Sequence, residues 1–161
     1  MGPGPHWRRI LYCNKIINHP KGEIMNEGLL NRNLAAAVAR QGHGDEMVIC
    51  DAGFAIPDGV EVVDLSVGVN LPTVEMVLAE LLKHHSVEKL IIAEATAEHS
   101  PSKLEKVRAL LPRDLPMESI PHAEMRQRAA KVKTVVRTGD FTAFSNFLLV
   151  SGSSERWYCE R

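Results

Sequence analysis

The sequence predicts an α/β fold in which a mainly parallel sheet carries helices on both faces. The first observation behind this prediction is an alternation: short apolar runs typical of buried strands are followed by stretches with helical periodicity, as in proteins built from βα units. The second is length and composition. With 161 residues, of which 45% are hydrophobic and 24% charged, the chain can form one core without disulfide or metal staples.

The first predicted helix and strands lie between residues 30 and 65. Apolar side chains spaced four residues apart define a helical face, and the helix ends at Gly42, a residue type favoured just after helix ends. These side chains are Leu30, Leu34 and Val38. Two short apolar runs follow and are predicted strands, at residues 46–50 and 60–65.

The second half of the chain continues the alternation. Pro72 is predicted at the first position of a long amphipathic helix. Ser100 is predicted as the N-cap of another helix, which begins at Pro101. A shorter helix is predicted at residues 123–132, and the remaining strands at residues 89–93, 117–120, 133–137 and 146–150.

Both ends of the chain differ from this pattern. Residues 1–24 have no helical or strand periodicity, so we expect an N-terminal extension that is not part of the fold. The domain is expected over residues 25–152, followed by a polar tail over residues 153–161. Lys21-Gly22-Glu23 can be encoded by a purine run that resembles a bacterial ribosome-binding site. This suggests that translation starts at Met25, which intact mass spectrometry of the protein from its natural host tests.

Charge and cysteine content narrow the partners and the compartment. The net charge is −1, with 19 basic residues spread among 20 acidic ones, so we expect no nucleic-acid partner. No apolar run approaches the ~20 residues that span a bilayer, so we expect no membrane partner. The three cysteines, Cys13, Cys50 and Cys159, are far apart. They indicate neither a disulfide framework nor a metal knuckle, which favours a reducing cytoplasm.

The motifs of several enzyme classes are missing from the sequence. No glycine-rich dinucleotide loop follows a strand, and there is no Walker loop, serine-hydrolase elbow or zinc-protease motif. Ser100-Pro-Ser-Lys103 matches only the bare SxxK pattern of penicillin-interacting enzymes, whose partner motifs are missing. We therefore expect no cofactor, and proton transfer between side chains and a substrate is the main candidate.

The first candidate for that chemistry is His43. It lies between Gly42 and Gly44 in the turn before strand 46–50, and a histidine side chain can both give and take a proton near neutral pH. Asp51 follows the same strand, at the edge where parallel α/β sheets bind ligands. We expect His43 and Asp51 to converge on one pocket. The alternative is that Gly-His-Gly is only a turn.

Two further segments supply polar side chains. His122 follows a short apolar run, either at a strand's carboxyl end or as an exposed residue at a helix start. Asn146 ends the polar loop 138–146, where its amide could bind a sugar hydroxyl or be a simple turn residue. A metal site is a further alternative, but no ligand spacing requires one and we expect no metal. Its ligands would be His43, Asp45, Asp51 and His122.

Taken together, these segments resemble the D-ribose pyranase family, of which L-fucose mutarotase is the sister branch. The resemblance extends from about Gly28 to Gly152, and five motifs carry it in the family's order and spacing. They are Gly28-Leu-Leu-Asn31, Arg40-Gln-Gly-His-Gly-Asp45, Val48-Ile-Cys-Asp-Ala-Gly-Phe-Ala-Ile-Pro57, Ile92-Ala-Glu-Ala-Thr96, and Val136-Arg-Thr-Gly139 followed by Phe144-Ser-Asn146.

The resemblance implies a three-layer α/β/α sandwich and an isomerase that interconverts the pyranose and furanose forms of free D-ribose without a cofactor. It makes His43 the catalytic proton donor. The implied substrate-binding residues are Asp51, His122, Phe144, Ser145 and Asn146. It also implies a homo-oligomer, since the family forms rings up to decamers with the sugar site between adjacent chains. An apolar docking surface is expected from Phe141, Phe144 and Phe147.

One position departs from the family. The loop that is Tyr-Ala-Asn in the family is Phe144-Ser145-Asn146 here, so a phenolic hydroxyl is missing. The segment 50–57 and His122 favour the ribose branch, while Gly44-Asp45-Glu46 also occurs in the fucose branch. The alternatives are an L-fucose-type mutarotase of the same family and a non-catalytic module that binds or senses a sugar.

Overall fold

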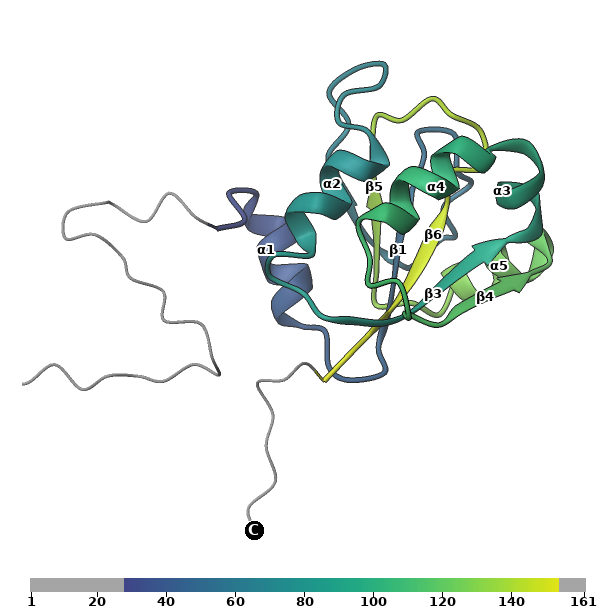
Figure 1. The fold of residues 1–161 in the computed structure, drawn as a ribbon. Coiled ribbons are helices and arrows are strands. Elements are labelled where there is room, and N and C mark those ends of the chain that lie inside the picture. Colours follow the sequence, from purple (N-terminus) through teal and green to yellow (C-terminus); the bar gives the residue numbers. More distant parts are fainter. Residues whose placement is uncertain (1–27, 154–161) are drawn as a thin grey trace, which may run out of the picture.

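The computed structural model describes residues 28–153, which form a six-stranded sheet with helices on both faces (Figure 1). The strands follow the order β2-β5-β1-β6-β3-β4 across the sheet. All run parallel except β6, which is antiparallel to both of its neighbours, β1 and β3. The strands are β1 (Glu46–Cys50), β2 (Glu61–Asp64), β3 (Val87–Ala93), β4 (Met117–Ile120), β5 (Thr134–Arg137) and β6 (Phe147–Ser151).

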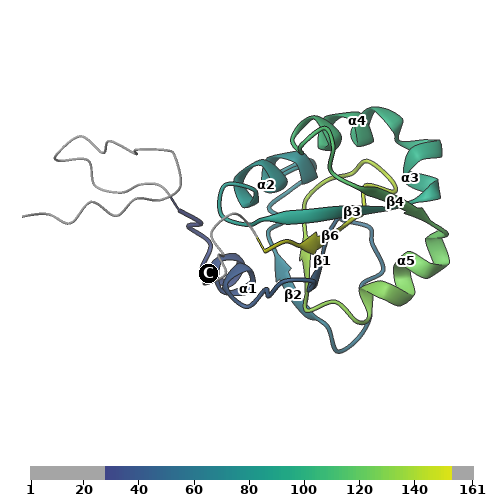
Figure 2. The ribbon, with the colours of Figure 1, turned by 60° about the horizontal axis from the view of Figure 1, so that its bottom comes forward.

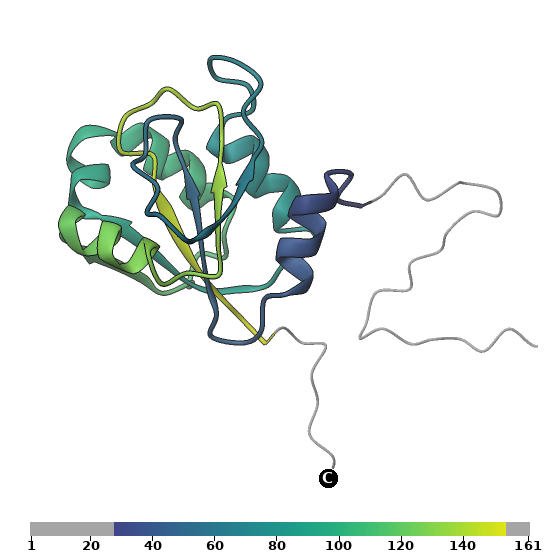
Figure 3. The same cartoon turned by 180° about the vertical axis from the view of Figure 1, so that it is seen from behind.

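The helices form two layers on opposite faces of this sheet. One buried cluster joins α1, α2 and α4 to one face, and a second joins α5 to the other. Figure 2 shows α2 and α4 on one side of the sheet and α5 on the other, and α1 and α5 flank the sheet on opposite sides in Figure 3. The predicted three-layer α/β/α sandwich is confirmed. The helices are α1 (Arg32–Ala39), α2 (Val74–Leu81), α3 (Glu94–His99), α4 (Pro101–Ala109) and α5 (His122–Ala129).

The central strand β1 shows why the sheet is buried on both faces. Successive side chains of a strand point to opposite faces, so Met47 and Ile49 pack with α1, α2 and α4. Val48 and Cys50 pack in the cluster that contains α5. Cys50 is fully buried in this cluster, in agreement with the unbroken apolar run of the sequence, and burial raises the pKa of its thiol.

The helix starts differ from the prediction in three places. Pro72 precedes the N-cap of α2 instead of occupying its first position, because the Thr73 hydroxyl accepts the Met76 N–H (3.4 Å) and supplies the cap. Ser100 precedes α4 as predicted, but its hydroxyl donates to the Ala143 carbonyl (2.6 Å) and does not cap the helix. The short helix α3 is missing from the prediction because only Thr96 among its residues is buried, so no apolar stripe marks it.

The predictions for the two ends of the chain lie largely outside the described residues. The extension over residues 1–24, the start at Met25 and the tail beyond Ser153 therefore stay predictions. Between residues 28 and 153, no helix combines the length and the apolar character needed to cross a membrane.

Candidate active site

A cavity of about 490 Å³ opens at the carboxyl ends of β1 and β5. This is the edge of the sheet at which α/β proteins bind ligands. Three segments bound the cavity: the loop after β1, the first turns of α5, and the loop between β5 and β6. The lining residues are 51–55, His122, Arg126, Arg137, 140–144 and Asn146. Four of the residues that the sequence singled out therefore meet here, namely Asp51, His122, Phe144 and Asn146.

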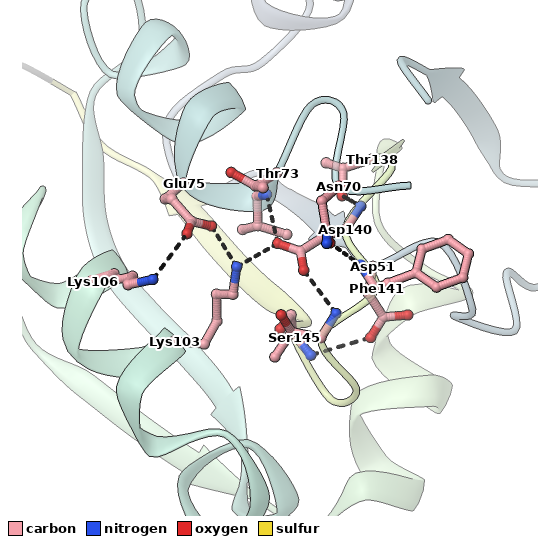
Figure 4. Close-up of polar contacts among 12 residues, drawn as sticks. Asp51, Asn70, Thr73, Glu75, Lys103, Lys106, Thr138, Asp140, Phe141 and Ser145 are labelled. Atoms are coloured by element: carbon pink, nitrogen blue, oxygen red, sulfur yellow. Dashed lines mark hydrogen bonds and ion pairs between the residues drawn. The ribbon is translucent and has the colours of Figure 1, made fainter. Parts of the chain in front are cut away.

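Asp51 is the most tightly held of these side chains. It is 6% exposed, and its two carboxylate oxygens accept hydrogen bonds from the backbone N–H groups of Gly53 (2.9 Å) and Ser145 (3.1 Å). The contact with Ser145 is drawn in Figure 4. Burial raises the pKa of Asp51 and outweighs these hydrogen bonds, which lower it. The result is a fixed carboxylate at the cavity wall.

Asn146 and Ser145 hold the loop between β5 and β6 against Asp51. The Asn146 Oδ1 accepts the Asp51 N–H (3.2 Å), so the amide orientation is set, and its Nδ2 group donates to no residue that the structure describes. Asn146 thus offers a donor to the cavity, which it lines. Ser145 does not line the cavity, and its contact with Asp51 is made by the backbone. The structure gives the predicted substrate-binding Ser145 a place behind the carboxylate.

Phe144 and His122 form the aromatic side of the cavity. The two rings meet edge to face with centroids 5.6 Å apart, and the centroid of the His99 ring lies 5.0 Å from that of Phe144. Phe144 has φ +59°, a conformation that is uncommon for a bulky residue and costs free energy. His122 begins α5, and its Nδ1 atom is buried without a hydrogen-bond partner among the described residues.

His43 lies at the other end of β1. Its side chain is 62% exposed, and its Nε2 atom is 2.8 Å from the carboxylate of Glu88 on β3. A five-residue strand spans about 17 Å, so His43 and Asp51 do not meet within one chain, contrary to our expectation. The reason is geometric: a residue that precedes a strand and a residue that follows it lie at opposite ends of that strand.

The turn that carries His43 is nevertheless well anchored. The Gly44 N–H donates to the carbonyl of Ser151 (2.8 Å), and the Ser151 N–H donates to the carbonyl of Asp45 (2.8 Å). The Asp45 carboxylate accepts the Gly42 N–H (2.6 Å) and pairs with Lys133. Asp45 and His43 thus lie together, remote from Asp51 and His122, so the alternative metal site is not assembled within one chain. Over residues 28–153 no three His, Cys, Asp or Glu side chains are grouped to hold a metal ion.

Three cavity residues escaped the sequence prediction. Asp140 and Arg137 follow or end β5, the neighbour of β1, so they reach the same sheet edge as Asp51. Arg137 donates to the Ala52 carbonyl (3.0 Å) and thereby holds the loop after β1. Arg126 lies four residues after His122 on α5, which places both on one helical face. The four-residue spacing could therefore have indicated from the sequence that Arg126 lies beside His122.

The loop 66–72 packs against the cavity loop from outside. A Cβ atom on Gly139 would lie 2.3 Å from the carbonyl oxygen of Gly68, so only glycine allows this approach. The Asn70 side chain accepts the Phe141 N–H (2.9 Å), as Figure 4 shows. Several apolar side chains stay exposed on these two loops: Val67, Val69, Leu71 and Phe141.

Comparison with known proteins decides the family. The model of the RbsD / FucU transport protein family matches residues 25–154. The chain belongs to this family. A D-ribose pyranase from Limosilactobacillus fermentum is 37% identical over 129 residues, which are 80% of this chain and 98% of the relative. One from Halalkalibacterium halodurans is 40% identical over the same shares.

Solved structures of the family have the same fold. Bacillus subtilis RbsD complexed with D-ribose has a TM-score of 0.75 and 34% identity, over 80% of this chain and 98% of that chain. FucU from Bifidobacterium longum has a TM-score of 0.63 and 19% identity, over 74% of this chain and 92% of that chain. The family resemblance inferred from the five motifs is thereby confirmed.

Proposed function

We propose that this protein is a D-ribose pyranase, an isomerase that interconverts the pyranose and furanose forms of free D-ribose. The observation that carries the proposal is the 37–40% identity to D-ribose pyranases over 98% of their length. The cavity supports it, because its volume lies within the usual range for small-molecule sites and it presents a carboxylate, an amide and an imidazole. Ribose is favoured over fucose, since the relatives at 37–40% identity are D-ribose pyranases and the RbsD structure complexed with D-ribose is 34% identical, against 19% for FucU.

The chemistry needs only proton transfers. A pyranose opens when the anomeric hydroxyl loses a proton and the ring oxygen gains one, and the aldehyde recloses through a different hydroxyl. In our proposal Asp51 accepts a hydrogen bond from one sugar hydroxyl, while Asn146 and His122 hold others. His43 moves the proton. A positioned acid–base group accelerates such a step by roughly 10²–10⁴-fold, which is adequate for a reaction that already proceeds in water.

We infer that His43 reaches the cavity of a neighbouring copy of the chain. Its exposed imidazole is remote from its own Asp51, whereas the cavity is bordered by exposed apolar side chains on the loops 66–72 and 138–146. Exposed apolar patches of this kind mark contact surfaces. Of the three phenylalanines expected to dock, only Phe141 fits, because it is 65% exposed, whereas Phe147 is in the core and Phe144 is partly buried. The assembly would be a homo-oligomer, of which a decameric ring is the form that the resemblance implies.

Mixed assemblies test the shared site. Chains with His43→Ala and chains with Asn146→Ala should each be inactive. Unfolding and refolding the two together should restore a fraction of ring exchange, because some sites then combine His43 of one chain with Asn146 of another. Refolded wild-type protein is the control. A mixture that stays inactive while the wild type recovers, or a monomeric mass by light scattering, would exclude a shared site.

Magnetisation-transfer NMR on equilibrated sugars tests the function itself. The protein should accelerate exchange between the pyranose and furanose signals of D-ribose without added metal or nucleotide. Acceleration of L-fucose but not of ribose would assign the protein to the fucose branch. Ribose binding without acceleration would identify a non-catalytic sugar-binding module.

We also infer a cytoplasmic location, in which a free thiol such as that of Cys50 stays reduced.

Restoring the family's tyrosine tests the role of the ring at position 144. Phe144→Tyr should leave ring exchange equal or raise it, because the added hydroxyl extends a ring that already lines the cavity beside His122. The rate of exchange by NMR checks this. A drop of tenfold or more, which is about 1.4 kcal/mol of transition-state stabilisation, would mean that the cavity is shaped for another sugar.

A further inference from the structure

Three buried polar side chains of α3 and α4 lie outside the proposed sugar contacts. They are Thr96, Ser100 and Lys103. Thr96 belongs to α3 and Lys103 to α4, and Ser100 lies at the junction between the two helices. Buried hydroxyls and ammonium groups are costly unless they are hydrogen-bonded, so what these three bind is informative.

All three bind the same loop, the one between β5 and β6 that lines the cavity. Thr96 donates its hydroxyl to the Phe144 carbonyl (2.7 Å), and Ser100 donates to the Ala143 carbonyl (2.6 Å). Lys103 donates to the Asp140 carboxylate (2.6 Å). These bonds fasten residues 140–144, including Phe144 in its uncommon backbone conformation. A strained residue persists only where its surroundings determine it, and this clamp of three side chains does so.

The ion pair between Lys103 and Asp140 is the buried centre of the clamp. Asp140 is 0% exposed, and its carboxylate also accepts the N–H groups of Val74 (3.0 Å) and Thr142 (2.9 Å). Lys103 is 6% exposed and binds Glu75 as well (2.7 Å). Figure 4 shows these contacts side by side. Burial lowers the pKa of Lys103, but the bonds to its two carboxylate partners outweigh burial and the pKa is raised, so the ammonium stays charged.

The clamped loop leads directly to the sugar-binding groups. Directly after residues 140–144, the Ser145 N–H binds the Asp51 carboxylate, and the Asn146 side chain binds the Asp51 backbone. Resting on the function proposed above, we propose that Lys103 is a positioning residue. Through Asp140, and assisted by Thr96 and Ser100, it sets the shape of the loop that orients Asp51 and Asn146 for ribose.

A matched pair of lysine variants tests this inference. Lys103→Met leaves Asp140 as a buried charge without its cation, which disturbs its surroundings strongly. The control is Lys106→Met on the same helix, because Lys106 is 65% exposed on its side chain and, among residues 28–153, pairs only with Glu75, at 3.9 Å. We expect K103M to raise KM for D-ribose about tenfold or more, with kcat within about threefold because His43 is not on the loop. Hydrogen–deuterium exchange of residues 138–147 should be faster in K103M and unchanged in K106M.

The double variant K103M/D140N removes both charges, so its loop should exchange more slowly than that of K103M alone. A wild-type KM and wild-type exchange in K103M would overturn the proposal, as would a loss of kcat at unchanged KM, the mark of a merely structural role. A double variant worse than K103M would exclude the route through Asp140.

If K103M does not fold, Thr96→Val removes one hydroxyl at nearly constant shape. It should raise KM about threefold and speed exchange of residues 138–147, and wild-type values would overturn the proposal. If the wild-type protein itself exchanges no ribose, the proposed function fails. The exchange of residues 138–147 in K103M against K106M still decides the clamp.

Discussion

Replacing His43 with alanine lowers the rate of D-ribose ring exchange by about 10²–10⁴-fold, the contribution expected of a positioned acid–base group. The side chain is mostly exposed and touches Glu88 only at the surface, so the fold and the affinity for ribose should change little. Magnetisation-transfer NMR measures the exchange rate, and thermal unfolding of the same sample checks that the protein is intact.

His43→Gln is the matched variant for this prediction. Glutamine can keep a hydrogen bond to Glu88 and similar bulk, but it cannot accept and release a proton near neutral pH. We expect it to be as inactive as alanine. If either variant exchanges ribose at the wild-type rate, His43 is not the proton-transfer group, and a full rate in His43→Gln alone would assign it a binding role.

Asp51→Asn raises KM for ribose about 10- to 100-fold, since hydrogen bonds to a charged group contribute about 1.5–3 kcal/mol. Asparagine keeps the size of the side chain but has one acceptor oxygen, whereas the aspartate oxygens serve two backbone N–H groups already. Ribose titrations followed by NMR or calorimetry measure the change. An unchanged KM would remove Asp51 from the sugar site.

The same variant has a distinct pH dependence. Burial raises the pKa of Asp51, so as the pH falls its carboxylate takes up a proton earlier than an ordinary aspartate, which titrates near pH 3.9. The protonated form loses an acceptor, and ribose binding weakens on the acid side. The wild type should therefore lose affinity at a pH above that of an ordinary aspartate, and Asp51→Asn should not show this step. If both proteins lose ribose affinity in the same way as the pH falls, the titrating group is not Asp51.

The fold was largely predictable because the strongest patterns in the sequence are those of the core. The run Met47-Val48-Ile49-Cys50 is apolar at every position, which is typical of a strand covered on both faces. The helix α3 was not predictable in this way, since it buries little and is held by a polar contact between Thr96 and Phe144. Such a contact depends on two segments 48 residues apart, which no local pattern records.

Part of the candidate site was predictable from the sequence, but its arrangement was not. Asp51, His122 and Asn146 meet because each follows or begins an element at the same sheet edge. His43 was expected in that pocket because its turn between two glycines could direct the imidazole into a cleft, but the strand between His43 and Asp51 separates the two. Ser100 and Lys103 are part of an SxxK pattern in the sequence, and nothing in that pattern indicates that they bind the loop between β5 and β6 that lines the cavity. Their roles depend on tertiary contacts alone.

Because β6 runs antiparallel to its neighbours, it connects the cavity at one end of the sheet to the turn of His43 at the other end. Asn146 precedes this strand at the cavity edge, and Ser151 closes it against the turn of His43. The five residues of β6 therefore fix the distance between the cavity of one chain and the His43 side chain that it would contribute to the next chain. In an assembly of the proposed kind, that span sets the repeat distance around the ring. A residue inserted into β6 would move the side chains of this strand to the opposite faces of the sheet. It would also change the distance between the cavity and His43.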